Sequence, residues 1–443
     1  MIDQDTLLSL AHDLVSAARR AGAEAAEASC GFDATTSASV RLGAVEDLTR
    51  AEAADIGLRV FIGQQSARVS ASDLSASSRA ALVERAVEMA RATPPDRFAG
   101  LVDPALLARG PQPALDLADD TALAAEAMVE LAREAEDTAR AVPGVTNSEG
   151  AGFSRAESLH AYVNSHGFAH AERRTKFSLS ASVLAESGAG KQRDYAYHTS
   201  RFLSNLDTPA AIGRLAGGRT VARLDPVKLA SGTMPVVFDP RVSASLLGHL
   251  IGAMSGPAIA RHSSFLIGKL GERVFPENIV ILETPHDQRG LRSRGVDSEG
   301  VATRQRALIE AGRVTGWLVD AASGRQLDMP PTGHAAGGGV SVANLALLPG
   351  MQSPQTLMAD IDLGLYVTEL IGMGVNGVTG DYSRGASGFL IAGGVLAQPV
   401  AEITIAGHLL DMYATLRAAN DLDRRTGIDA PTVRLEGMTI AGN

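Results

Sequence analysis

A regular alternation of apolar and polar residues constrains the fold of this chain more than any other feature of its sequence. Leu159, Ala161 and Val163 alternate with polar or aromatic neighbours, and the same period of two returns at residues 177–183 after a turn at residues 164–167. Side chains of a β-strand point alternately to its two faces, so this period predicts a hairpin with one buried face. The other elements must therefore be arranged around a sheet.

Helical and extended patterns follow one another along the rest of the chain. The first helix is expected after a cap at Asp5 and ends at Gly22. Further helices are predicted at residues 75–93, 118–142, 207–224, 242–254 and 407–422. Strands are predicted at residues 37–42, 56–62, 66–70, 235–238, 279–283, 305–310, 314–319, 361–370, 389–392 and 403–405.

Two proline-bearing stretches divide the pattern into three parts. Residues 93–113 contain five prolines, which remove backbone donors and block helices, and residues 225–235 form the second break. We therefore predict domains at 1–110, 111–230 and 231–443. The fold class is α+β, with mixed N-terminal and middle domains and a Gly-rich, mostly antiparallel β domain with a few helices at the C-terminal end.

Charge and cysteine content exclude several classes of protein. The 443 residues carry a net charge of −10, which argues against direct nucleic-acid binding because that function calls for a basic face. No run of about 18 apolar residues predicts a membrane span, and the first residues do not have the pattern of a secretory signal. Cys30 is the single cysteine, so no intrachain disulfide or Cys-rich zinc site is possible, and a cytoplasmic location is expected.

Three features could carry chemistry, and each also has a plain structural reading. The Gly-rich run at residues 333–339 could let backbone N–H groups approach an anion or an extended peptide, or it could be a surface loop. His160, His166 and His170 share one parity and could bind zinc, or they could lie at a solvated hairpin end. Ser387 lies one residue short of a nucleophile elbow, and a tight turn explains its glycines better.

The helix at residues 242–254 does not form a metal site by itself. A zinc-protease helix needs two histidines about one turn apart and a glutamate that activates water. This helix has a single histidine, His249, no glutamate, and Ala253 one turn further on. Taken alone, the sequence argues against a self-sufficient catalytic site.

The chain nevertheless resembles a known family, TldD/PmbA, and within it the PmbA (TldE) branch, whose members have been called modulators of DNA gyrase. The resemblance runs nearly from end to end. The motifs that carry it lie at residues 245–248, 255–257, 261–266, 294–300, 332–334, 344–345, 348–350, 380–389 and 433–442.

The resemblance implies a subunit of a zinc metalloprotease that is itself inactive. TldD-type chains carry HExxxH on the corresponding helix, with a cysteine near the C-terminus. Here Gly248 and Ala253 replace the two histidine ligands, His249 replaces the glutamate, and residues 421–427 contain no cysteine. Glycine and alanine offer no donor atom, so we expect no catalytic residue and no metal in this chain, with zinc in the TldD-type partner.

The resemblance also implies partners and a substrate class. A TldD-type chain would pair with this one as a heterodimer, a homodimer is possible for the chain alone, and unfolded or extended peptides would pair with a strand edge. His249, His262, Asp381 and Ser383 are candidates for the wall of a substrate channel. Two alternatives stay open: a peptide-binding scaffold without hydrolytic role, and a hydrolase that uses His160, His166 and His170.

Overall fold

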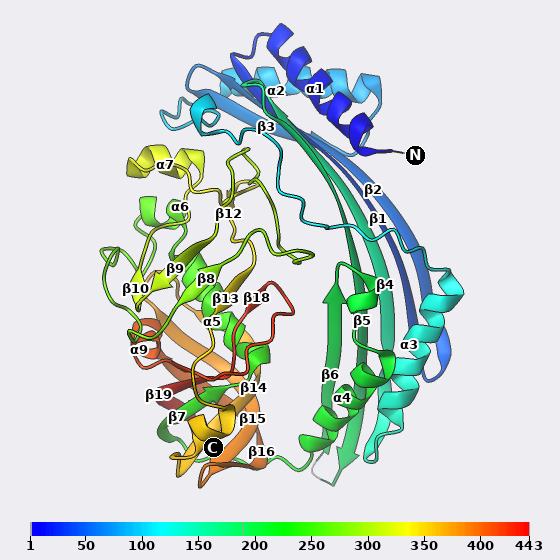
Figure 1. Ribbon diagram of the computed structural model, residues 1–443, viewed down its shortest axis with the longest axis vertical. Coiled ribbons are helices and arrows are strands. Elements are labelled where there is room, and N and C mark those ends of the chain that lie inside the picture. Colours follow the sequence, from blue (N-terminus) through cyan, green and yellow to red (C-terminus); the bar gives the residue numbers. More distant parts are fainter. Residues whose placement is uncertain (1, 189, 443) are drawn as a thin grey trace.

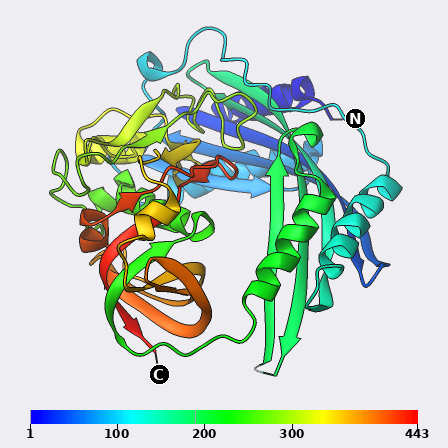
Figure 2. The ribbon, with the colours of Figure 1, turned by 60° about the horizontal axis from the view of Figure 1, so that its bottom comes forward.

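A curved six-stranded sheet forms one side of the molecule, and a second, β-rich body faces its concave surface (Figures 1 and 2). The computed structural model describes residues 2–188 and 190–442. None of the helices among these residues is both long and apolar enough to cross a membrane.

The large sheet has the strand order β3-β2-β1-β4-β5-β6, and all of its neighbouring strands are antiparallel. Its strands are β1 (Ala25–Arg41), β2 (Ala44–Ile62), β3 (Gln65–Ala71), β4 (Val145–Asn164), β5 (Ala169–Ser187) and β6 (Gly190–Ser200). The predicted hairpin at residues 152–184 is confirmed as β4 and β5, because the register pairs Leu159 with Arg173 and Val163 with Ala169.

Two pairs of helices cover the convex face of this sheet (Figure 1). They are α1 (Gln4–Arg20) with α2 (Ala76–Ala92), and α3 (Ala125–Arg140) with α4 (Pro209–Ala222). Each pair buries its own apolar cluster against alternate strand residues, with Cys30 in the first cluster and Phe153 and Phe177 in the second. Short 3₁₀ turns lie at η1 (Pro104–Leu106) and η2 (Leu203–Asn205).

The C-terminal body contains a closed barrel of five strands. The order is β16-β15-β14-β7-β19, and a further pairing between β16 and β19 closes the ring. Its strands are β7 (Gly232–Phe238), β14 (Leu363–Val375), β15 (Asp381–Ala392), β16 (Val395–His408) and β19 (Val433–Ala441), with β17 (Arg417–Ala418) attached to β19. The largest apolar cluster of the protein fills this barrel and the space around it.

A five-stranded sheet and several short helices lie beside the barrel. The strand order is β10-β9-β8-β13-β18, and a separate small hairpin is formed by β11 and β12. The strands are β8 (Ile281–Glu283), β9 (Arg306–Glu310), β10 (Arg313–Val314), β11 (Ala335–Ala336), β12 (Gly339–Val340), β13 (Leu345–Leu347) and β18 (Ile428–Asp429). The helices of this half are α5 (Pro240–Ala253), α6 (Gly256–Ala260), α7 (Ala321–Leu327), α8 (Pro354–Met358) and α9 (Leu409–Ala414).

The predicted α+β class with an antiparallel C-terminal region is confirmed, but several element bounds were wrong. The helix expected at residues 407–422 is only α9, because β16 continues to His408 and residues 417–418 pair with β19. The helix expected from residue 118 begins at Ala125, since the backbone before it is held by Thr175. Asp3, not Asp5, caps the first helix.

Strand lengths were the other error. The segment predicted at residues 37–42 is the end of the 17-residue β1, whose first part consists largely of small and polar residues without a strong β signal. Of the strand predicted at residues 314–319, a single residue lies in a named strand, because β10 (Arg313–Val314) ends at Val314. The three-domain division stays a prediction, and the strands on both sides of residue 110 lie in one sheet.

Candidate functional site

Helix α5 supplies one wall of a pocket at the edge of the barrel. Asp239 caps the helix by accepting from the backbone N–H of Arg241 at 2.9 Å, and Pro240 occupies the first helical turn. Leu246 and Leu250 are buried against the barrel, whereas Gly248 and Gly252 are exposed. The glycines therefore leave one face of α5 open to solvent.

The pocket lies on this open face and has a volume of about 300 Å³. No aspartate or glutamate lines it. Its lining residues are Gly248, His249, Gly252, Ala253, Ser263, Phe265, Met373, Val375, Gly377, Arg384 and Leu409. All three positions that correspond to the HExxxH helix, Gly248, His249 and Ala253, are among them.

His249 and Tyr382 are polar residues with unpaired buried atoms beside this pocket. Their rings meet edge to face with 5.9 Å between centroids. Neither Nε2 of His249 nor the hydroxyl of Tyr382 has a hydrogen-bond partner among the described residues. Burial lowers the pKa of His249, and the nearby guanidinium of Arg384 lowers it further, so the imidazole is neutral at pH 7.

The alternation of β15 decides which of its residues reach the pocket. Tyr382 lies in the barrel core, so Arg384, two residues further on, is on the same face toward α5. Asp381 and Ser383 point to the opposite face and are exposed. The structure thus does not bring these two channel candidates together with His249.

His262 also lies apart from the pocket. It is exposed in the turn after α6 with a φ of 55°, and its neighbour Ser263 lines the pocket in its place. Of the four channel candidates, only His249 is a lining residue of this pocket.

A free strand edge runs beside the pocket. β14 pairs with β15 along most of its length, but its pairing with β7 covers only Leu365 to Val367. Residues 368–375 therefore have no neighbouring strand on that side. At the start of this segment Thr368 is buried and Glu369 pairs with Arg223. Further on, Ile371 and Met373 have 56% and 87% of their surfaces exposed, so this part of the edge presents apolar side chains to an extended chain.

The residues at the helix do not fit a zinc ion. The side chains of Gly248 and Ala253 have no donor atoms, and among the described residues His249 supplies the pocket's only imidazole. Across residues 2–188 and 190–442, no group of three or more His, Cys, Asp or Glu side chains is placed to hold a metal. The segment 421–427 lies elsewhere, since Asp423, Arg424 and Arg425 line a different pocket of about 660 Å³.

The three histidines of the central hairpin are only partly brought together. His160 and His170 share the concave face with Glu172, which pairs with His170 at 3.8 Å. His166 lies in the turn, where its Nδ1 contacts the carbonyl of Val102 at 2.8 Å. Burial raises the pKa of Glu172, but His170 and Arg174 outweigh burial and lower this pKa to about 2. The main feature of the cluster is therefore an ionised carboxylate that pairs with a cation.

The Gly-rich loop closes another pocket, between the two bodies. Gly337, Gly338 and Gly339 face His160 and Arg59 of the large sheet across a space of about 370 Å³. Nearby, the buried His334 contacts Glu283 through Nε2 at 2.8 Å and Thr332 through Nδ1 at 2.7 Å. This arrangement explains the Thr332-Gly333-His334 motif as the anchor of the loop.

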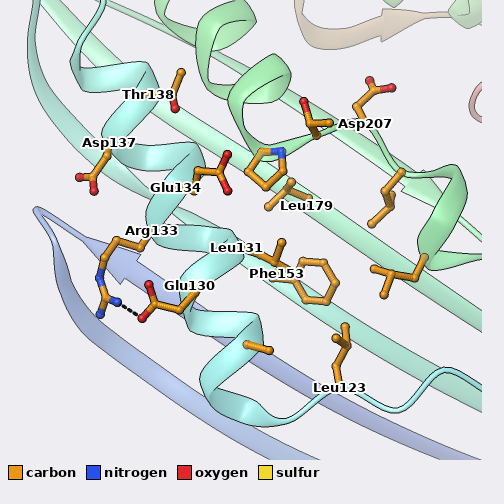
Figure 3. A pocket seen from close by; sticks show the side chains of 15 residues that line it. Leu123, Glu130, Leu131, Arg133, Glu134, Asp137, Thr138, Phe153, Leu179 and Asp207 are labelled. Carbon is orange, nitrogen blue, oxygen red and sulfur yellow. Dashed lines mark hydrogen bonds and ion pairs between the residues drawn. The ribbon is translucent and has the colours of Figure 1, made fainter.

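The convex side carries a further hollow, between α3 and α4 (Figure 3). It has a volume of about 880 Å³, with Phe153 and Leu179 at its base and Glu130, Glu134 and Asp137 along α3. It lies on the sheet face opposite the C-terminal body.

Sequence reasoning missed two parts of the candidate site. Arg384 lies in the motif at residues 380–389, but only the strand parity relative to Tyr382 shows that it faces α5. The free edge at residues 368–375 depends on where β7 ends, which no pattern within β14 reveals.

Comparison with known proteins agrees with this architecture along the chain. Three domain descriptions match: "PmbA/TldA metallopeptidase domain 1" at residues 26–90, the central domain at 118–224, and the C-terminal domain at 231–442. The solved structure of a protein described as a modulator of DNA gyrase, from Bacteroides thetaiotaomicron, superposes with a TM-score of 0.92 at 26% identity, covering 100% of both chains. TldE from Thermococcus kodakarensis shares the fold, with a TM-score of 0.85 at 21% identity over 98% of this chain and 100% of that one.

The barrel, its helix-lined pocket and these matches together show that the chain is related to metallopeptidases. "Metalloprotease PmbA" of Escherichia coli O157:H7 is 39% identical over 408 residues, which are 92% of this chain and 90% of the relative. The chain belongs to the PmbA/TldD family, and the resemblance seen in its motifs is confirmed.

Proposed function

We propose that this chain is the non-catalytic, peptide-binding subunit of a two-chain zinc metalloprotease, with a TldD-type chain as the catalytic partner. The observation that carries the proposal is the free edge of β14 at residues 368–375, with its exposed apolar residues Ile371 and Met373, directly beside a pocket whose helix has no metal ligands at Gly248 and Ala253. An extended peptide can add to such an edge through its backbone, and side-chain pockets then provide selectivity.

Family membership supports a role in proteolysis, and the donor-free helix supports placing the metal in the partner. Zinc, the heterodimer, the unfolded substrate, the cytoplasmic location and the absence of nucleic-acid binding remain predictions. The proposed role of this chain is to bind and orient the peptide. Met373 and Val375 belong to both the strand edge and the pocket, so a peptide on β14 would pass directly over His249 and Arg384.

The test is hydrolysis of an unfolded reporter peptide by this chain, with and without a purified, zinc-loaded TldD-type partner. Activity only in the mixture is expected. Met373→Asp should raise the KM of the mixture several-fold, because it places a charge on the apolar edge without disturbing the core. Met351→Asp is the matched control, since Met351 is 96% exposed and belongs neither to β14 nor to the lining of the pocket.

Two results would contradict the proposal. Chelator-sensitive hydrolysis by this chain alone would instead favour a hydrolase whose metal site is formed by His160, His166 and His170. If the mixture with a folded partner does not hydrolyse the reporter peptide, but this chain binds the peptide, the result would favour a scaffold without hydrolytic role.

A further inference from the structure

Arg384 is an arginine in the pocket without an acidic partner. Its Nε donates to the carbonyl of Ile371 at 3.4 Å, and no ion pair involves its guanidinium among the described residues. No carboxylate lines the pocket either. Its two terminal nitrogens are therefore available, and a guanidinium presents them in the fork geometry that matches a carboxylate.

The imidazole beside it is also incompletely bonded. Nε2 of His249 is inaccessible to solvent and has no hydrogen-bond partner among the residues that the structure describes. The hydroxyl of Tyr382, a residue 2% exposed whose ring contacts His249, is likewise unpartnered. Buried polar groups in folded proteins nearly always have partners, so two unpaired groups next to one pocket distinguish it from the packed core around it.

Apart from Ser263, whose hydroxyl donates to the carbonyl of Ala258 at 3.2 Å, the remaining side chains of the pocket wall are apolar. Phe265 and Leu409 are buried beneath it, and Met373 and Val375 border it from β14. A volume of about 300 Å³ lies at the lower end of the range for ligand sites, roughly 300–1,000 Å³. The space suits one amino-acid residue better than a long segment.

A single unpaired guanidinium in a mostly apolar pocket favours a ligand that combines one anionic group with an apolar part. A carboxylate of a peptide has this chemistry, since one arginine can neutralise its single charge. The free edge of β14 leads to the pocket, so a peptide paired along residues 368–375 would deliver such a group there.

We propose that the pocket beneath the open face of α5 binds a peptide carboxylate, with Arg384 as its charge partner. The inference rests on the proposed peptide-binding function and deepens it, because it assigns the ligand chemistry of the same site. The carboxylate can come from the C-terminus of a peptide or from an aspartate or glutamate side chain.

Binding of labelled peptides to the full chain tests the proposal, by fluorescence anisotropy or calorimetry. The probes are one apolar hexapeptide with a free C-terminal carboxylate, the same peptide amidated, and an amidated version with glutamate as the last residue. We expect the free peptide to bind the unmodified chain about tenfold more tightly than the amide. Equal affinity of the glutamate peptide and the free peptide would identify any carboxylate as sufficient, and equal affinity of the glutamate peptide and the amide would restrict the site to a C-terminus.

Arg384→Gln should remove the difference between the free peptide and the amide, and Arg384→Lys should retain part of it. Arg214→Gln is the control, because Arg214 is exposed on α4, and it should leave the difference unchanged. If the amide binds the unmodified chain as tightly as the free peptide, the carboxylate site is overturned while peptide binding stands. If neither peptide binds, the proposed function fails as well. The comparison on the unmodified chain remains decisive even if Arg384→Gln does not fold.

Discussion

Glu299 and Glu172 have the same side chain and opposite electrostatic behaviour. Burial raises the pKa of Glu299 to about 8, and the charges of Asp297, Glu27 and Asp320 act in the same direction. His170 and Arg174 instead overcome burial and hold the pKa of Glu172 to about 2. The partners of Glu172 stand two residues to either side of it on β5 and can be read in the sequence. The burial of Glu299 and its approach to Glu27 of the large sheet depend on how the two bodies pack.

The raised pKa of Glu299 makes the protein less stable as the pH increases. The folded state binds a proton more tightly than the unfolded state, whose value is near 4.5, so stability falls between pH 4.5 and 8. Glu299→Gln should therefore raise the free energy of unfolding at pH 8.5 by on the order of 3 kcal/mol and change it little at pH 4. Urea unfolding at the two pH values measures this, with Glu88→Gln, an exposed position on α2, as the control.

An equal effect of Glu299→Gln at both pH values would contradict the assignment. Glu299 accepts a hydrogen bond from the backbone N–H of Ala321 at 2.8 Å. A glutamine can accept the same bond, so loss of this bond would not contribute to the measured difference in stability.

At the scale of elements, the hairpin tip of β1 and β2 depends on a residue of α3 that lies 94 residues further along the chain than Leu42. Glu136 of α3 is fully buried and accepts from the backbone N–H groups of Leu42 and Gly43 at 2.7 and 2.9 Å. These two residues have φ angles of 52° and 80°, the left-handed pair that a tight hairpin turn requires. Without the carboxylate, a leucine in that conformation would be poorly held.

Glu136→Ala should lower the free energy of unfolding by about 2–3 kcal/mol, because two donors lose a charged acceptor. Glu136→Gln should cost less, since its carbonyl oxygen can still accept one bond. Faster hydrogen exchange at Leu42 and Gly43 would report the loosened tip. Glu134→Ala, at an exposed position of the same helix (Figure 3), is the matched control, and an equal loss in both alanine variants would rule out the turn contact as the cause.

At the scale of the whole molecule, a small apolar cluster joins the large sheet to the C-terminal body. Tyr162 and Phe168 of the central hairpin pack with Val296, Val301 and Ala321, and with Val102 and Leu107 of the linker. Gly300 has a φ of 87° and lies so close to Phe168 that a Cβ would meet its ring at 2.8 Å. The cluster thereby fixes the position of the Gly-rich loop opposite the sheet.

Phe168→Ala should cost about 3–5 kcal/mol of stability through the lost contacts and the cavity. It should also loosen the two bodies, seen as a larger radius of gyration in small-angle scattering and faster proteolysis within residues 93–113. Leu106→Ala serves as the control, because Leu106 is 42% exposed in the same linker. An unchanged radius and proteolysis rate would show that other contacts hold the two bodies together.

Elements whose signals are local could be predicted from the order of the residues alone. The period of two gave the central hairpin, the helical period gave α2 and α5, and the missing donors at Gly248 and Ala253 could be read directly. Local signals failed where partners override propensity, as in the polar first part of β1, which is held between β2 and β4, and in the short α9, which lies between two paired strands.

Which residues form the candidate site depends on how distant segments pack together. It turned Arg384 toward α5 and Asp381 and Ser383 away, it left the edge of β14 free beyond β7, and it placed residues 421–427 in another pocket. The physical reason is that hydrogen-bond register and packing between distant segments fix these placements. A side chain's residue type fixes its chemistry, whereas its partners, burial and exposed edge depend on segments far away in the chain.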